Sequence, residues 1–131
     1  MLKSIIQVTI VAAGLAVGFA ASAYAQTPVA IGETAKGKTL TDAKGMTLYV
    51  FDKDATPGKS VCNGACATNW PPVAASAADK AGDGYTVIVR DDGSKQWAHN
   101  NKPLYRFIKD KKPGDIVGDG FLNGAWHVAQ P

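Results

Sequence analysis

The sequence has few of the residues on which most reaction chemistry depends, with only two cysteines and two histidines among 131 residues. Its serines lie in no nucleophile motif, and it contains neither an H-E-x-x-H zinc motif nor a phosphate-binding glycine loop. Carboxylate pairs without a visible cleft do not indicate acid–base catalysis. The sequence thus favours a protein that is not an enzyme, without deciding the question, and indicates no cofactor.

An excess of charge of one sign is also absent. The chain has 14 Lys and Arg residues against 11 Asp and Glu residues, a net charge of +3. Such a small and evenly spread charge does not indicate nucleic-acid or membrane recognition. Lys109, Lys111 and Lys112 form a cluster, but Asp110 lies among them, which is typical of a solvated loop. We therefore predict no nucleic-acid partner.

The first 25 residues have the features of a secretory signal peptide. Lys3 supplies a positive charge, residues 5–19 form an apolar stretch, and Ala23-Tyr24-Ala25 matches the small-x-small cleavage pattern. A membrane-spanning helix needs about 20 apolar residues and usually a charged flank, which this segment lacks. We predict cleavage after Ala25 and a periplasmic or secreted protein, residues 26–131, with no transmembrane segment after cleavage.

Two copies of one pattern, residues 29–73 and 85–129, make up most of the remaining chain. Tyr49 and Tyr105 are 56 positions apart, and the same offset pairs many other residues without a gap. These pairs include Gly37 with Gly93, Leu48 with Leu104, Pro57 with Pro113, Gly58 with Gly114 and Trp70 with Trp126. Two copies are too few for a solenoid, so we predict one domain with pseudo-two-fold symmetry. Residues 74–84, which are small and polar, are the predicted linker.

Each copy is predicted to form three short antiparallel strands. These are residues 29–31, 38–41 and 46–51 in the first copy, and residues 85–90, 95–98 and 104–108 in the second. Gly37 and Gly93 fall in turns that favour positive φ. Residues 62–69 can form one helical turn, because Pro71 and Pro72 then end it. The predicted fold is therefore mostly β, a single domain of two tandem three-stranded antiparallel repeats with little helix.

Aromatic residues alternate along both predicted third strands. The period of two places Tyr49 and Phe51 on one face, and Tyr105 and Phe107 on the matching face of the second copy. This pattern favours a shared aromatic core over a platform on which a ligand stacks.

Three longer motifs carry a resemblance to a known family. They are Tyr49-x-Phe51-x-x-Asp54 with Tyr105-x-Phe107-x-x-Asp110, the run C-x-G-x-C-A-x-x-W-P-P from Cys62 to Pro72, and RDDGSKQWAHNNKPLY from Arg90. Together they resemble the bacterial secreted repeat family, predicted lipoproteins with a Y-x-(F/W/Y)-x-x-D motif and no assigned biochemical role. The resemblance covers essentially the whole mature chain. It implies a secreted, β-rich domain of two repeats, with motif residues Tyr49, Phe51, Asp54, Tyr105, Phe107, Asp110, Trp70 and Trp126. No cysteine follows the apolar stretch, so we expect no lipid anchor.

Cys62 and Cys66 are the sharpest chemical feature, and we predict a structural disulfide between them. An exported protein usually oxidises its cysteines. Four residues of strand span about 13 Å, far beyond the Cα separation of a disulfide, so residues 62–66 must turn. The second copy has Gly118 and Leu122 at these positions and builds the segment without a bridge. We therefore expect a local staple, with Cys66 in apolar packing as Leu122 would be.

Two metal sites are the alternatives to a purely structural role. Reduced Cys62 and Cys66 with His99 or His127 would make a soft-metal site suited to copper, and the same thiols could serve redox chemistry. Asp54 and Asp110 are the symmetric acids, and we expect each to accept backbone N–H bonds in its Pro-Gly turn. Calcium bound by these aspartates is the other reading, although no calcium-loop spacing is present.

The sequence therefore predicts an exported binding or structural module of the periplasm or cell envelope. Its partner would be an unidentified envelope ligand or protein, and the chain is expected to be monomeric. Periplasmic thiol-redox or copper chemistry at Cys62 and Cys66 is the first alternative. Calcium binding by the repeat aspartates is the second.

Overall fold

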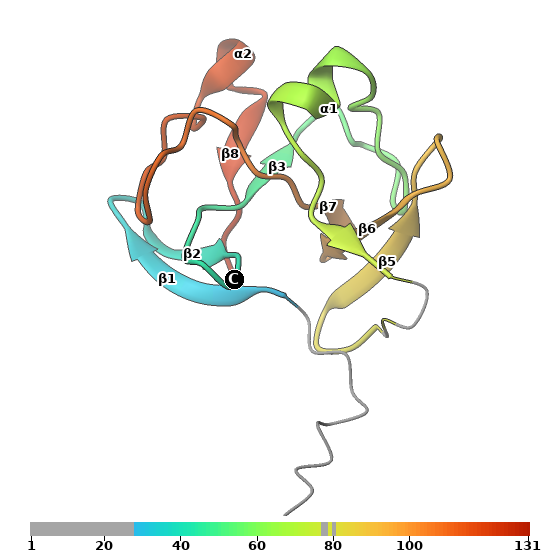
Figure 1. Ribbon diagram of the computed structural model, residues 1–131, viewed down its shortest axis with the longest axis horizontal. Helices are drawn as coiled ribbons and strands as arrows, with labels where there is room; N and C mark the ends of the chain where they lie inside the picture. The colour runs from blue at the N-terminus through green and yellow to red at the C-terminus, as the bar shows by residue number, and fades with distance from the viewer. Residues whose placement is uncertain (1–27, 77–78, 80) are drawn as a thin grey trace, which may run out of the picture.

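The computed structural model describes residues 28–76, 79 and 81–131, which form a mostly β domain (Figure 1). The predicted signal peptide and positions 77, 78 and 80 of the predicted linker lie outside the described residues. Within the described part of the chain, no helix is long and apolar enough to cross a membrane.

Short antiparallel strands and two helices of one turn make up the domain in the described residues. The first copy contains β1 (Ala30–Thr34), β2 (Gly37–Thr41), β3 (Tyr49–Phe51) and α1 (Ala65–Asn69). The second contains β5 (Tyr85–Val89), β6 (Lys95–His99), β7 (Lys102–Pro103), α2 (Phe121–Gly124) and β8 (Trp126–Val128). Between them, β4 (Ala74–Ala75) lies in the predicted linker and pairs with β6. The prediction of a mostly β fold with antiparallel repeats is confirmed.

The two copies exchange their C-terminal segments. Strand β3 of the first copy pairs with β8 of the second, with Phe51 opposite Trp126. In the reverse direction, Tyr105 bridges to Pro72, and the Arg106 N–H donates to the Pro71 carbonyl at 2.8 Å. Figure 1 shows the result: α2 and β8 stand on the side of the β1–β2 hairpin, and α1 and β4 on the side of β5 and β6. Each half of the domain is therefore built from both copies.

The predicted third strand of the second copy, residues 104–108, was wrong. The structure has strand only at Lys102–Pro103, and residues 104–108 form no regular strand beyond the bridges of Tyr105. The reason lies in the facing segment, where Pro71 and Pro72 have no N–H to donate to a ladder. The equivalent segment of the second copy contains His127 and Val128 instead, and it forms β8, which the sequence pattern did not predict.

The gapless alignment of the copies also fails locally, because β6 is shifted by one residue. The Leu40 N–H donates to the Ala129 carbonyl, whereas Trp97, and not Gln96, donates to the carbonyl of Val73, the equivalent of Ala129. The turn between β5 and β6 is longer than the turn between β1 and β2. The turn after β6 is shorter than the turn after β2, and so compensates for the longer turn. The two changes cancel, so the offset of 56 is restored at residue 104. In consequence, Trp97 fills the core position that Leu40 fills in the first copy.

The core consists of two apolar clusters, both of which draw on both copies. The aromatic cluster is Tyr49, Phe51, Cys62, Trp70, Tyr105, Phe107, Trp126 and Val128. The second cluster is Leu40, Leu48, Val73, Trp97, Leu104 and Ala129. Because each copy supplies roughly half of each cluster, neither copy can bury its apolar face alone, as expected of a duplicated unit.

Candidate functional site

Four aromatic rings form a continuous stack at the interface of the copies. The rings of Trp70 and Trp126 lie parallel with centroids 3.8 Å apart. Phe107 stacks on the outer face of Trp70 at 4.0 Å, and Phe51 on Trp126 at 4.2 Å. All four side chains are buried, which agrees with an aromatic core. Offset and parallel aromatic pairs add about 0.5–1.5 kcal/mol each beyond their buried area.

The motif tyrosines and aspartates join the two copies by reciprocal hydrogen bonds. Tyr49 donates its O–H to Asp110 Oδ2 at 2.6 Å, and Tyr105 donates to Asp54 Oδ2 at 2.6 Å. The other oxygen of each carboxylate accepts a backbone N–H seven residues on, from Val61 at 2.7 Å and from residue 117 at 2.9 Å. The aspartates therefore close their turns, as expected, and also hold the tyrosine of the opposite copy.

Burial raises the pKa of both aspartates and of both tyrosines. For Asp54 and Asp110 desolvation is the largest cause, and the tyrosine hydrogen bond lowers each pKa in opposition. Desolvation also raises the pKa of Tyr49 and of Tyr105, and the neighbouring carboxylates raise both further. The tyrosines therefore remain donors at neutral pH, and each carboxylate depends on its tyrosine for compensation.

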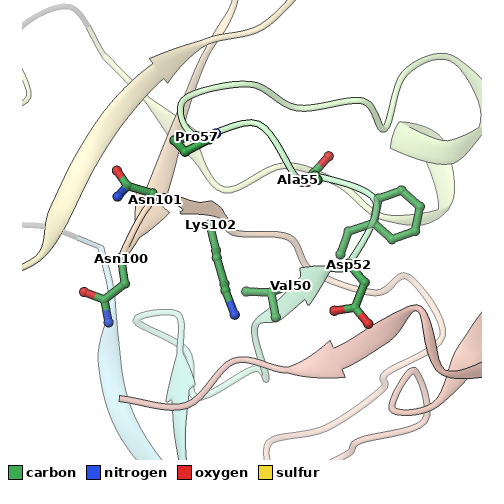
Figure 2. Close-up of a pocket in the computed structure, with 9 residues that line it drawn as sticks. Val50, Asp52, Ala55, Pro57, Asn100, Asn101 and Lys102 are labelled. Atoms are coloured by element: carbon green, nitrogen blue, oxygen red, sulfur yellow. The ribbon is translucent and has the colours of Figure 1, made fainter.

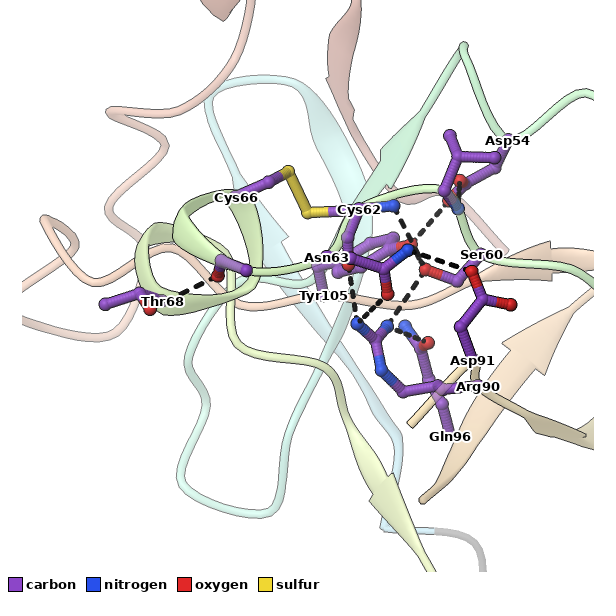
Figure 3. Close-up of a disulfide and its surroundings, with 12 residues drawn as sticks. Asp54, Ser60, Cys62, Asn63, Cys66, Thr68, Arg90, Asp91, Gln96 and Tyr105 are labelled. Carbon is purple, nitrogen blue, oxygen red and sulfur yellow. Dashed lines mark hydrogen bonds between the residues drawn. A yellow bond between two sulfur atoms is a disulfide. The ribbon is translucent and has the colours of Figure 1, made fainter. Parts of the chain in front are cut away.

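A polar network distinguishes one half of the domain (Figure 3). Ser60 Oγ lies 2.6 Å from the Tyr105 hydroxyl and accepts an N–H from Arg90 at 2.9 Å. The Arg90 side chain is buried and also donates to Gln96 Oε1, to the Cys62 carbonyl and to Asn63 Oδ1. In the other half, Tyr49 simply accepts the Gly118 N–H at 3.2 Å.

The Cys62–Cys66 disulfide is present, with its Cα atoms 5.2 Å apart. Gly64 turns the chain with φ 57°, and α1 begins directly after it. The Cys62 side chain is fully buried, and Cys66 is half-buried against the aromatic cluster. We expected Cys66 and Leu122 to occupy the same kind of apolar packing. That expectation was wrong for Leu122, which is 54% exposed. The bridge fastens the loop whose carbonyl holds Arg90.

Two adjoining surface hollows form one concavity, here called the β3 groove. One has a volume of about 410 Å³ and the other about 340 Å³, and they share Val50, Asp52, Asn100 and Lys102. The first extends towards Pro57 and Asn101 (Figure 2). The second extends to His99 and His127. Three segments far apart in the chain thus build the groove, which sequence proximity alone could not reveal.

Charged and hydrogen-bonding groups line the β3 groove. His127 Nε2 lies 2.7 Å from Asp52 Oδ2, and both side chains are well exposed. His99 packs at a tilt against the Tyr85 ring at 4.8 Å, and its burial lowers its pKa. Asn100 has φ 49° and Asn101 φ 66°, a conformation that asparagine tolerates and that fixes this turn. The groove therefore offers a carboxylate, two imidazoles, an ammonium group and amides to one ligand.

The predicted metal residues are only partly brought together. His99 and His127 line the same hollow, whereas Cys62 and Cys66 do not line it and are joined to each other. Among residues 28–76, 79 and 81–131, no group of three or more His, Cys, Asp or Glu side chains could hold a metal ion. In Asp54 and in Asp110, one carboxylate oxygen accepts a hydrogen bond from a tyrosine and the other accepts one from a backbone N–H.

The groove residues that sequence reasoning missed carry a usable signal, because they do not recur in the other copy. Asp52 corresponds to Ile108, Lys102 to Met46 and His127 to Pro71. The hollow in the equivalent place is lined by Asp42, Lys44, Val73 and Arg106, among others, and there Arg106 pairs with Asp42 at 3.4 Å. Comparing the copies position by position would have marked Asp52 and Lys102 together with the histidines.

The geometry defines a duplicated β module with exchanged ends and a groove whose Asp52, Lys102 and His127 have no counterparts in the equivalent hollow of the other half. A family model described as "Secreted repeat of unknown function" matches the chain twice, over residues 30–74 and 86–130. The chain therefore belongs to this family of secreted repeats, which confirms the resemblance. No curated protein and no solved structure was found to match it.

Proposed function

We propose that the protein is a non-catalytic binding module of the periplasm or cell envelope and that the β3 groove is its ligand site. The observation that carries this proposal is the gathering of Asp52, His99, Lys102 and His127 around two joined hollows. Volumes of this size are typical of small-molecule sites. The family description as a secreted repeat and the predicted cleavage after Ala25 support the location.

The chemistry of the groove favours a small polar ligand with both acidic and basic groups. Asp52 supplies an acceptor for a cationic or N–H group, and Lys102 supplies a donor for a carboxylate or phosphate. The Asn100–Asn101 turn adds two amides on the side of Lys102 away from Asp52 (Figure 2). A turn that is already formed keeps the ordering cost of binding low. None of the residues that line the groove is a nucleophile activated by a buried base, so binding suits the groove better than catalysis.

A nuclear magnetic resonance titration tests the proposal. Isotope-labelled protein is titrated with the low-molecular-weight fraction of a cell-envelope extract, and backbone shifts are followed for the wild type, Lys102→Ala and Lys44→Ala. Lys44 lines the equivalent hollow of the other half and provides the matched control. We expect saturable shifts around residues 50–52, 99–102 and 127–130 that Lys102→Ala abolishes and Lys44→Ala preserves.

Three results would overturn the proposal. Shifts confined to another surface would place the ligand site elsewhere, and the absence of saturable shifts would remove the ligand. Turnover in a broad hydrolase or oxidoreductase screen, lost on mutation of one groove residue, would make the protein an enzyme.

A further inference from the structure

The end of the domain that carries α2 has an exposed apolar surface, here called the α2 tip. It consists of Ile108, Val117, Phe121 and Leu122, which are 45%, 52%, 44% and 54% exposed. Phe121 stands on the aromatic core, tilted against Phe107 at 5.1 Å and edge-on to Trp70 at 6.0 Å. A rigid core therefore supports the tip from beneath. Phe121 and Leu122 are neighbours in the chain, and Ile108 precedes Lys109, whose Nζ lies over the Phe121 ring. Exposed apolar side chains that gather in this way mark interaction sites.

The backbone of the tip is held in an unfavourable conformation. Leu122 has φ 55° and ψ 54°, and Asn123 has φ 56° and ψ 38°, so two consecutive residues other than glycine are left-handed. Asparagine tolerates this region, but leucine does so only at a cost on the order of 1 kcal/mol. Because the Leu122 side chain is largely exposed, its burial does little to offset this cost.

Two lysines lie beside the α2 tip. Lys109 Nζ is 5.8 Å from the centre of the Phe121 ring, and Lys111 Nζ is 3.4 Å from the Ile108 carbonyl oxygen. Lys112, the next residue along the chain, is exposed as they are. Asp110, the acid that stands among them in the sequence, is buried and engaged with Tyr49, so its charge faces inward. Asp115 is half-buried and accepts the backbone N–H groups of residues 111 and 112. Asp119, two residues before Phe121, is paired with Lys36 at 3.3 Å. With these acids compensated or engaged, the remaining outward-facing charge beside the apolar tip is positive.

We propose that the α2 tip docks on an anionic phospholipid surface, with Phe121 and Leu122 in the interface and the three lysines at the headgroups. Apolar side chains flanked by lysines are the combination that binds such surfaces. No tip residue lines any of the four hollows described for this part of the chain, which favours a surface partner over a peptide held in a groove. A second copy seated symmetrically on the tip would bring lysines against lysines, which disfavours self-association.

This proposal revises the expectation from the sequence that the lysine cluster is only a solvated loop. The sequence places Asp110 in the middle of the cluster, whereas the fold turns that carboxylate into the core. It is independent of the β3 groove, because the two surfaces share no residue.

Flotation with lipid vesicles tests the proposal on the exported protein purified without detergent, with the N-terminus of every variant checked by mass spectrometry. The vesicles contain phosphatidylcholine alone or mixed with phosphatidylglycerol. We expect binding to the mixed vesicles that falls with added salt. Replacing Lys111 and Lys112 by Gln should weaken it about fivefold for each lysine removed.

Leu122→Asn is the decisive variant, because asparagine suits the left-handed backbone while it removes the apolar side chain. We expect binding to the anionic vesicles to fall on the order of tenfold, while the melting temperature stays constant or rises. Ile31→Thr removes another exposed apolar residue, 61% exposed and located on β1, and should bind as the wild type does. Equal binding of wild type and Leu122→Asn would overturn the proposal. Equal binding of the wild type to neutral and to anionic vesicles would also overturn it, as would no binding to either. A dimer that Leu122→Asn converts to monomer would do the same.

Discussion

The reciprocal tyrosine–aspartate bonds should dominate the pH dependence of stability, and Tyr49→Phe tests this. The substitution keeps the ring that packs edge-on against Trp70 at 5.3 Å, and it removes only the hydroxyl. Asp110 then loses its 2.6 Å donor in a buried place. A hydrogen bond to a charged group contributes about 1.5–3 kcal/mol, so we expect that loss in unfolding free energy at neutral pH.

The sign of the pH effect follows from the direction of the shift. Desolvation raises the pKa of Asp110 above its ordinary value of 3.8, so the folded protein binds more protons than the unfolded chain between these two pKa values. The contribution of Asp110 to stability is therefore most favourable below pH 3.8 and declines as the pH rises through the folded-state pKa. Tyr49→Phe removes a bond that lowers this pKa, so the decline becomes larger and extends to higher pH.

Urea unfolding of both proteins at intervals from pH 4 to pH 8 measures the effect, with Tyr105→Phe as the matched control. Tyr105→Phe removes the equivalent hydrogen bond to Asp54. Arg90 remains nearby in that variant, and its charge also lowers the pKa of Asp54. The pH-dependent part of the loss should therefore be smaller for Tyr105→Phe. A cost of Tyr49→Phe that is below about 0.5 kcal/mol, or the same at pH 4 and pH 7, would refute this reasoning.

Three further substitutions test the packing and the bridge, each by chemical denaturation. Gly118→Ala should cost about 1–3 kcal/mol by overpacking, because a Cβ there would lie 2.6 Å from the Trp70 ring, whereas Gly82→Ala meets no atom within 4 Å and should be neutral; equal effects would contradict the packing argument. Cys66→Ser should cost about 2 kcal/mol, the loop-closure value for so short a loop, and leave a folded protein; complete unfolding would show that the bridge is more than a local staple. Arg90→Met leaves Gln96 Oε1 without its donor and should cost at least about 1–3 kcal/mol; a neutral result would remove the network from the stability of this half.

The parts of the fold that depend on recurrence were predictable from the sequence. The duplication, the aromatic core and the turn-closing role of Asp54 and Asp110 follow from residues that appear in both copies. The exchange of ends was not predictable, because strand patterns show which segments are extended but not which copy each segment pairs with. Periodicity marked β3 as an extended run and did not mark β8, and only their pairing, with Phe51 opposite Trp126, shows that they belong together.

The candidate site was harder to predict than the fold, for a physical reason. The disulfide joins residues four apart and obeys local geometry, so the expected export together with the short spacing was sufficient to predict it. The β3 groove joins Asp52 to His127, which are 75 positions apart, across a strand pair that the sequence did not indicate. The inward turn of Asp110, which uncovers the lysine cluster, likewise depends on the tyrosine of the other copy.

The differences between the copies also explain how one scaffold can hold two unlike halves. In the β1–β2 hairpin, the hydroxyl oxygens of Thr34 and Thr39 lie 2.8 Å apart. In the β5–β6 hairpin, Arg90 and Gln96 take the equivalent places, and the Arg90 guanidinium donates to Gln96 Oε1 at 2.8 Å. The longer arginine reaches past the hairpin to the carbonyl of Cys62, a contact that the threonine pair is too short to make. The loop of residues 60–63 is therefore tied to the β5–β6 hairpin as well as to the disulfide. Its counterpart around Gly118 is held by Tyr49 and by Asp119, which accepts the Val128 N–H at 3.1 Å and pairs with Lys36 at 3.3 Å, and it leads into the strained, exposed α2 tip. The two loops thus differ in the contacts that hold them, while the recurring tyrosines, aspartates and tryptophans keep both on the same core.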